Sequence, residues 1–409
     1  MLLKLARHSL WNRRGTALLT VVSLTVSITL LLAIDHIRRE AKASFTSALS
    51  GTDLVVGARS SNINLLLYSV FHIGDATSNI SWNSYQIIDT HSSVAWTVPI
   101  SLGDSHKGYR VIGTSKAFFE HYKFGQKQQL QLATGAPFDD HHGVVLGAQV
   151  ARKLGYQLGD KVVLAHGTSG ISFTHHDNHP FSVVGILKPT GTPVDRSLLV
   201  SLEGIEAIHL DWQPQPGEPR NDSLQPKNIT ACLIGLASKA KTFSLQRKIN
   251  SYKGEPLLAI LPGATLAELW RMLGVVENLL YLISVLVLLA TLTGMVTTLL
   301  AAMKERQREI AILRAIGAHP LFLFLLIELE VLLLAALSIV CAFTLLSASL
   351  TVAAPWLAAE YGLFLSATII NHHNLVLAVV VLVLATILGA IPAYRAYRNA
   401  LQNGLVINS

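Results

Sequence analysis

One short segment of the chain is rich in side chains that bind transition metals. It contains His175, His176, Asp177 and His179, whose imidazole and carboxylate groups are good ligands for zinc. Their spacing matches no defined zinc site, and a polar histidine-rich loop is also an ordinary solvated segment. Two interpretations stay open, a zinc site linked to transport or a solvated loop.

A second candidate site is the turn from Pro189 to Arg196. Proline and glycine set the backbone angles of tight turns, and Thr190, Asp195 and Arg196 add a hydroxyl, a carboxylate and a guanidinium group. The two charged side chains can pair with each other or with a ligand. The pattern favours a structural turn, and ligand binding is the alternative.

Glu328 and Glu330 lie within a long apolar run. A carboxylate inside a membrane costs about 2–4 kcal/mol and is by default a candidate functional group. Both residues lie near one end of the run, where basic residues and interfacial water can satisfy them. We therefore favour a structural role over a role in proton or substrate movement.

Motifs for catalysis are absent from the sequence. No Ser/His/Asp, metalloprotease or glycosidase spacing occurs, and no G-x-x-x-x-G-K-[ST] motif is present to bind ATP. We expect that the chain is not an enzyme, that it binds no cofactor of its own and that any ATP is hydrolysed by another polypeptide.

Composition places the chain among membrane proteins. Of 409 residues, 51% are hydrophobic and 14% are charged. The net charge of +7 does not indicate nucleic-acid binding, because many basic residues flank apolar runs instead of forming a patch interleaved with aromatic residues.

Four apolar runs are long enough to span a membrane: 15–34, 279–302, 321–350 and 375–391. The first is too long for a typical signal peptide, so we expect an uncleaved anchor. The segments before the first span, between the second and third spans and after the fourth span are basic, whereas 351–374 has no Lys or Arg. The positive-inside rule assigns the basic segments to the cytoplasm. The cytoplasmic segments are then 1–14, 303–320 and 392–409, and the extracytoplasmic ones are 35–278 and 351–374.

The segment 303–320 is charged, favours a helix and lies between two spans. Its first half is mostly charged and its second half mostly apolar, so it suits a position half in the membrane surface and half on a cytoplasmic partner. A plain interfacial amphipathic helix is the alternative. The residues assigned to the partner contact are Glu305, Arg306, Arg308, Glu309, Arg314 and Gly317.

The large extracytoplasmic segment predicts an α+β domain on a helical stalk. Residues 35–49 and 264–303 continue the first two spans as helices, and a capping box at Thr265 and Glu268 predicts the start of the second. Between them, short β-branched runs at 54–57, 143–146, 161–164 and 181–187 predict strands, and 148–154 predicts a helix. The apolar run 63–71 suits a buried helix, or a face for a lipid-like substrate or a partner chain.

These features together resemble the FtsX/MacB-like permeases of ABC transporters, the mechanotransmission or type VII group. The resemblance rests on the one-plus-three arrangement of spans, on the segment from Glu305 to Ala318 and on the closing run from Gly389 to Arg395. The run 144–164 is similar to the family's periplasmic core domain. The fold so implied is a four-helix membrane bundle with an inserted MacB-like periplasmic domain.

The resemblance also implies a function. It implies a multi-pass protein of the bacterial inner membrane, with both termini cytoplasmic. It would work with an ABC ATPase that binds ATP and magnesium and with a second permease chain, identical or different. A periplasmic adaptor or substrate protein and membrane lipid are further expected partners. The outer domain would act on a lipoprotein, lipid, peptide or drug; the alternatives are a regulatory subunit that activates a periplasmic partner and a zinc-linked transport component.

Overall fold

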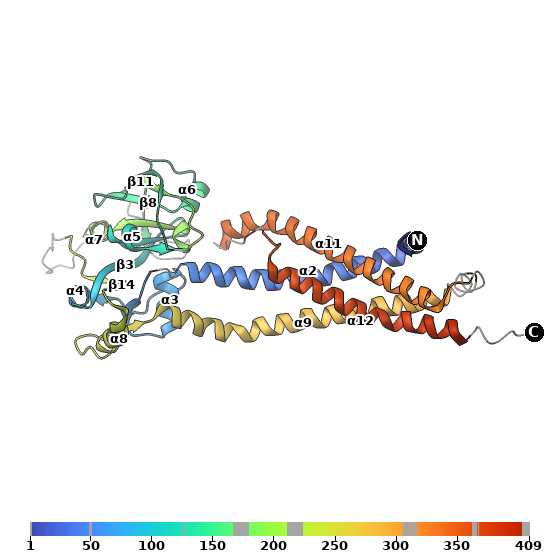
Figure 1. Cartoon of the computed structure of the whole chain (residues 1–409). Coiled ribbons are helices and arrows are strands. Elements are labelled where there is room, and N and C mark those ends of the chain that lie inside the picture. Colours follow the sequence, from blue (N-terminus) through green and yellow to red (C-terminus); the bar gives the residue numbers. More distant parts are fainter. Residues whose placement is uncertain are drawn as a thin grey trace, which may run out of the picture. The chain divides into compact units, whose positions relative to one another are not determined.

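The structure is a computed structural model that describes residues 2–48, 51–125, 127–166, 180–210, 224–305, 312, 317–361, 366 and 368–402 (Figure 1). The chain divides into two compact units. Unit 1 comprises Met1–Glu40, Gly274–Trp356 and Leu365–Ser409, and unit 2 comprises Ala41–Leu273 and Leu357–Phe364.

Unit 1 is helical. Among the residues that the structure describes, four helices of this unit are long and apolar enough to cross a membrane, as the sequence predicts, and α11 continues into the segment predicted to be an extracytoplasmic loop. The helices that contribute to unit 1 are α1 Leu2–Asn12, α2 Arg14–Ser47, α9 Pro262–Glu305, α11 Pro320–Tyr361 and α12 His372–Gln402.

Close packing of small side chains holds the helices of unit 1 together. A Cβ atom added at Gly389 of α12 would lie 2.8 Å from the Cγ atoms of Val331 in α11, so only glycine permits this approach. The Ser338 hydroxyl of α11 donates to the carbonyl oxygen of Leu334 in its own helix, at 2.8 Å, and also lies 3.4 Å from the carbonyl oxygen of Val21 in α2. Small side chains are typical of helix contacts in membranes, because they let the backbones come close.

Unit 2 is built on one mixed sheet. Its strand order is β15-β1-β14-β3-β4-β12-β8-β11-β7, with β10 paired to β3 and β9 paired to β11. The pairs β8–β11 and β4–β12 are parallel and the other pairs are antiparallel. The strands are β1 Leu54–Ala58, β3 Val94–His106, β4 Tyr109–Thr114, β7 Leu132–Gly135, β8 Gly143–Leu146, β9 Lys161–Val162, β10 Ala165–His166, β11 Phe181–Leu187, β12 Ser197–Ser201, β14 Ala231–Leu236 and β15 Leu257–Ile260.

Helices cover both faces of the sheet near β1, and this explains why every residue of β1 is buried. Val55 packs with Leu65 and Leu66 of α3 on one face, whereas Leu54 and Val56 belong to the cluster that includes α4 and α8 on the other. The further helices of unit 2 are α3 Asn62–Val70, α4 Trp82–Asp89, α5 Ala117–His121, α6 Ala148–Leu154, α7 Leu202–Leu210, α8 Thr242–Asn250, and the 3-10 helices η1 Pro193–Arg196 and η2 Lys239–Lys241. Short strands pair as β2 Ile80–Ser81 with β13 Asn228–Ile229 and as β5 Lys123–Phe124 with β6 Gln128–Gln129.

Several predicted elements have the bounds that the sequence indicates. The strand 143–146, the helix 148–154 and the strand 181–187 are confirmed as β8, α6 and β11. The apolar run 63–71 is confirmed as a buried helix, because Leu65 and Leu66 of α3 have no exposed surface.

Two predicted bounds are wrong. The strand expected over 161–164 ends at Val162, because β9 pairs with β11 and the chain then leaves that partner to form β10 on β3. The helix expected from Ala264 begins at Pro262, so Thr265 lies inside its first turn. Proline suits the first position of a helix, since its fixed φ angle is helical and its missing N–H needs no partner there.

Candidate functional site

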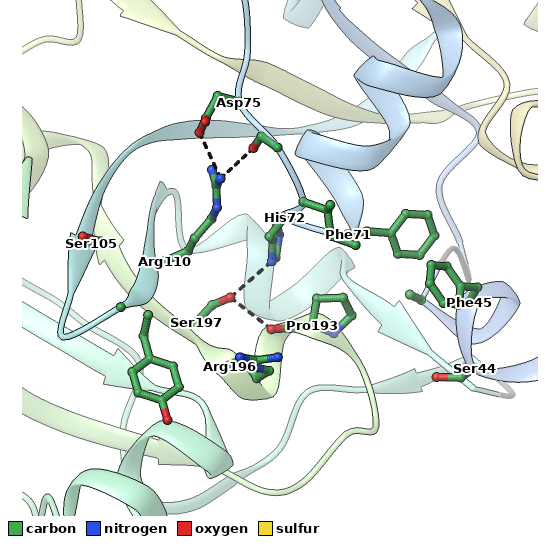
Figure 2. A pocket seen from close by; sticks show the side chains of 15 residues that line it. Ser44, Phe45, Phe71, His72, Asp75, Ser105, Arg110, Pro193, Arg196 and Ser197 are labelled. Atoms are coloured by element: carbon green, nitrogen blue, oxygen red, sulfur yellow. Dashed lines mark hydrogen bonds and ion pairs between the residues drawn. The ribbon is translucent and has the colours of Figure 1, made fainter. Parts of the chain in front are cut away.

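A pocket of about 480 Å³ opens within unit 2 where four segments of the chain meet (Figure 2). The end of α2 contributes Ser44, Phe45 and Ala48. The turn after α3 contributes residues 71–75, the β3–β4 hairpin contributes residues 105 and 108–110, and the turn before β12 contributes Pro193, Arg196 and Ser197.

The turn before β12 is held by the carboxylate of Asp195. This side chain is 1% exposed and accepts hydrogen bonds from the backbone N–H and the hydroxyl of Thr190 and from the N–H of Gly191, each at 2.9 Å. Gly147 lies against the same turn, and a Cβ atom there would be 2.3 Å from the carbonyl oxygen of Val194. The turn is therefore fixed from within by Asp195 and from outside by the start of α6.

Burial raises the pKa of Asp195, while the hydrogen bonds from Thr190 and Gly191 and the charge of Arg152 oppose that rise. All three donors belong to the turn, so the carboxylate serves the turn. Arg196, its neighbour, is half-buried at the pocket. Within the part of the chain that the structure describes, its guanidinium group makes no hydrogen bond or ion pair.

A second guanidinium group at the pocket is paired. Arg110 of β4 donates through one terminal nitrogen (Nη2) to the carbonyl oxygen of Gly74, at 2.6 Å, and to Oδ1 of Asp75, at 2.9 Å. Figure 2 shows this arginine pointing toward Asp75. The Asp75 side chain is 66% exposed, so solvent weakens the attraction of this pair.

His72 lies in the turn after α3 and contacts the turn before β12 through Ser197. The Ser197 hydroxyl donates to the carbonyl oxygen of Pro193, at 3.1 Å, and lies 3.2 Å from Nδ1 of His72. Ser197 must then accept from Nδ1–H, which leaves Nε2 of the neutral ring as an acceptor. Burial, aided by the charge of Arg110, lowers the pKa of His72 to about 3, so the ring is neutral near pH 7.

One wall of the pocket is apolar. The rings of Phe45 and Phe71 have centroids 4.7 Å apart, and Figure 2 shows them together on the side opposite Arg110 and Ser105. The backbone of His72, which follows Phe71, has a φ angle of 55°, a left-handed conformation that non-glycine residues rarely adopt. Such backbone strain is often found at functional sites.

The pocket contains only part of the site predicted from sequence. Thr190 and Asp195 are brought together in the turn, and Arg196 lies at the pocket. Nothing in the sequence marks His72 or Arg110 as site residues. These residues carry no local motif, and only the fold brings them to the turn.

The other predicted sites lie in unit 1 or outside the described residues. Arg306, Arg308, Glu309 and Arg314 fall outside them. Glu305 is the last residue of α9, and Gly317 has a φ angle of 96°, which favours glycine just before α11. Glu330 is 3% exposed and has an interaction partner. Both carboxylate oxygens of Glu328 are buried without a hydrogen-bond partner among the residues that the structure describes.

A polar cluster in unit 1 also escapes the sequence analysis. Arg39 of α2 donates to Oδ2 of Asp35, at 2.8 Å, and to Oδ1 of Asn374 in α12, at 2.6 Å. Nε2 of His373 lies 3.5 Å from Oδ1 of Asp35. The spacing of Asp35 and Arg39, four residues apart on a helix, is visible in the sequence, but their partners in α12 are not.

The histidine-rich segment with His175, His176, Asp177 and His179 lies outside the described residues. Among the residues that are described, no group of three or more His, Cys, Asp or Glu side chains is arranged to hold a metal ion.

Comparison with known proteins gives two family matches that together cover most of the chain. Residues 17–252 match the family model of the MacB-like periplasmic core domain. Residues 281–401 match that of the FtsX-like permease C-terminal domain. The first match includes the pocket, and the second includes α11 and most of α12.

Individual relatives are more distant. The chain is 25% identical over 189 residues to the lipoprotein-releasing system transmembrane protein LolE of Haemophilus influenzae, a match that covers 46% of this chain and 42% of that protein. The periplasmic region of MacB from Actinobacillus actinomycetemcomitans is 11% identical, with a TM-score of 0.34 over 55% of this chain and 97% of that one. The extracellular domain of the ABC-type transporter YknZ from Gram-positive bacteria is 12% identical, with a TM-score of 0.31 over 51% and 98%.

Proposed function

We propose that this chain, which belongs to the MacB- and FtsX-like family of ABC-transporter permeases, converts ATP hydrolysis by a separate ATPase subunit into movement of its outer domain. The family membership rests on the two matched domains. The outer domain is unit 2, and the ATPase would bind the segment that follows α9.

The observation that carries the proposal is the length and continuity of α9. This helix has 44 residues and runs without interruption from Pro262 to Glu305. It begins two residues after β15, a strand of the sheet in unit 2, and it ends at Glu305, inside the charged segment 303–320, here called the coupling segment. A continuous helix transmits displacement along its axis, because each backbone hydrogen bond links one turn to the next.

The charges support one direction of insertion. Lys and Arg flank the first span on its N-terminal side, and 351–374 has neither. We therefore place both termini and the coupling segment in the cytoplasm of a bacterium. The outer domain then lies in the periplasm, with the four long helices in the inner membrane.

The substrate is one that an outer domain of this kind can reach from the periplasm or the membrane: a lipoprotein, a lipid, a peptide or a drug. The name of the Haemophilus relative includes lipoprotein release. That match spans less than half of the relative, so lipoprotein is one candidate among these four classes.

The working unit would contain more than this chain. A second permease copy would complete the membrane part, and two ATPase subunits would bind ATP and magnesium. The chain itself would hydrolyse nothing. Membrane lipid and a periplasmic adaptor or substrate protein are the remaining partners.

The test is affinity purification of the chain extracted from membranes, beside a variant with Glu305→Lys and Glu309→Lys. An ABC ATPase should be recovered with the unaltered chain and lost with the variant, because reversing two charges turns attraction into repulsion at the contact.

A matched control carries the same reversals at Glu120 and Glu203, two exposed residues of unit 2. This control should recover the ATPase as the unaltered chain does. If no ATPase is recovered with the unaltered chain, or if both variants retain it equally, the coupling proposal is wrong.

A further inference from the structure

We propose that the pocket of Figure 2 binds a small amphiphile that carries one oxyanion group, a phosphate or a carboxylate, with the oxyanion against Arg196. The inference rests on the proposed function for the role of the site, since a ligand held there would be what the outer domain acts on. The binding itself needs no ATPase.

Charge is the first argument. The charged side chains that line the pocket are Arg110, Arg196 and Asp75, so the lining has a surplus of one positive charge. The carboxylate of Asp75 forms an ion pair with Arg110, at 2.9 Å. His72 adds no charge, because burial keeps its pKa at about 3. The surplus charge is therefore on Arg196.

The local geometry explains why Arg196 has no carboxylate partner among the described residues. The adjacent carboxylate of Asp195 is buried and directed to the N–H and hydroxyl groups of Thr190 and Gly191. No carboxylate in the described part of the chain approaches Arg196 within ion-pair distance. A half-buried guanidinium group presents several N–H donors in one plane, the arrangement that binds phosphate and carboxylate oxygens in pairs.

The apolar wall decides what the oxyanion is attached to. Phe45, Phe71 and Pro193 line the same pocket, and the first two form a ring pair. An inorganic ion would leave this surface wet, whereas a short alkyl or acyl chain would cover it. The volume of about 480 Å³ lies in the range of pockets for small molecules and is too small for a folded protein segment.

His72 adds a directional contact. Its Nδ1–H is held by Ser197, so Nε2 is left as an acceptor. An acceptor in a pocket that also holds a cationic group suits a ligand with a hydroxyl or N–H in addition to its oxyanion, as in the head group of an acidic lipid. The pocket lining thus offers both a donor group for the anion and an acceptor for a second polar group of the ligand.

The experiment is isothermal titration calorimetry of the full chain in nanodiscs of a zwitterionic phospholipid, with no ATPase present and with hexyl phosphate as the probe. We expect saturable binding at one site per chain. Arg196→Gln should weaken that binding at least tenfold. Arg247→Gln, which removes the same charge from an exposed position on α8, should leave the affinity unchanged.

Two further titrations separate the parts of the ligand. Inorganic phosphate and hexanol should each bind at least tenfold more weakly than hexyl phosphate. If inorganic phosphate binds as tightly, the ligand is a free ion and the amphiphile assignment is wrong. If hexanol binds as tightly, Arg196 has no part in recognition and the proposal is also wrong.

If the Arg196→Gln variant does not fold, a labelling experiment on the unaltered chain tests the proposal instead. A photoreactive alkyl phosphate should label the unaltered chain at residues 71–75 or 193–197. Labelling confined to other residues, or unsaturable uptake of hexyl phosphate, would overturn the assignment. The ATPase is absent from all of these experiments. Failure to bind hexyl phosphate would therefore not contradict the proposed coupling to an ATPase, and failure to recover an ATPase would not contradict the proposed ligand site.

Discussion

The neighbouring side chains of Asp195 and Arg196 have opposite charges and separate roles. Asp195 points into the turn and binds three donors there, whereas Arg196 lies at the pocket without a carboxylate partner in the described chain. The fold therefore uses one charge for structure and leaves the other available. A sequence motif in which the two residues are adjacent does not reveal this division.

His72 makes the pocket region sensitive to acid. In the unfolded chain its pKa returns to about 6.5, whereas in the folded chain it is about 3. Between these values the unfolded state binds more protons, so the free energy of unfolding falls as the pH is lowered from 7 toward 5, by up to about 1.4 kcal/mol per pH unit. Hydrogen-exchange protection factors of β12 amides, measured against pH, should report this loss.

Replacement of this histidine supplies the check. His72→Asn should flatten the pH dependence, because asparagine does not titrate and tolerates the left-handed backbone. His142→Asn, at an exposed histidine, should retain it. Equal slopes in the His72→Asn variant and the unaltered chain would show that another group titrates.

At the scale of elements, the sequence predicts what depends on local pattern. The bounds of β8, α6 and β11 follow from β-branched runs and from glycine, including Gly155 at the end of α6, whose φ angle is 72°. The four long helices follow from apolar length. By contrast, the length of β9 depends on where the chain changes strand partners, and nothing in its own residues encodes that.

The pocket is the part of the site that sequence reasoning could not predict. Its lining comes from residues as distant as Phe45, Arg110 and Arg196. Phe45 and Arg110 carry no local signal, and their meeting with Arg196 depends on the pairing of β12 with β4 and on the position of the turn. Only the turn itself, with Thr190, Asp195 and Arg196, is marked locally by proline and glycine.

A proline placed within α9 tests whether this helix transmits motion to the sheet of unit 2. Met272→Pro should break the helix at an exposed position, since a proline inside a helix removes a hydrogen bond and costs about 3 kcal/mol. We expect the variant to retain the proposed ATPase partner but to lose any ATP-dependent change in the sheet of unit 2. Hydrogen exchange of β15, with and without ATP, measures that change.

Met272→Ala is the matched control, because it removes the same side chain and keeps the helix. It should respond to ATP as the unaltered chain does. An ATP-dependent change in β15 that survives the proline would mean that α9 does not transmit the motion.

For the molecule as a whole, the described residues of a single chain provide four candidate spans. Large apolar side chains of α9 and α12 are exposed, among them Leu282 at 53% and Val379 at 59%. These surfaces suit lipid or a second permease chain.

We expect two permease chains in the assembled complex. Native mass spectrometry of the complex released from detergent should find two copies of a 44.3 kDa chain, or one copy with a second permease of different mass. A complex with ATPase subunits and a single permease chain would contradict this prediction.

The pairing of β1 with β15 has a consequence for synthesis. These strands join the beginning of the outer domain to its end, with Val55 opposite Ile260. Its other partner, β14, also comes late in the chain, so both sides of β1 must stay unpaired until nearly the whole domain has left the ribosome and crossed the membrane. Closure of so long a loop is slow, so the nascent chain carries an open strand edge during export. A chaperone that shields this edge would raise the yield of the folded protein more than one that acts on the membrane helices.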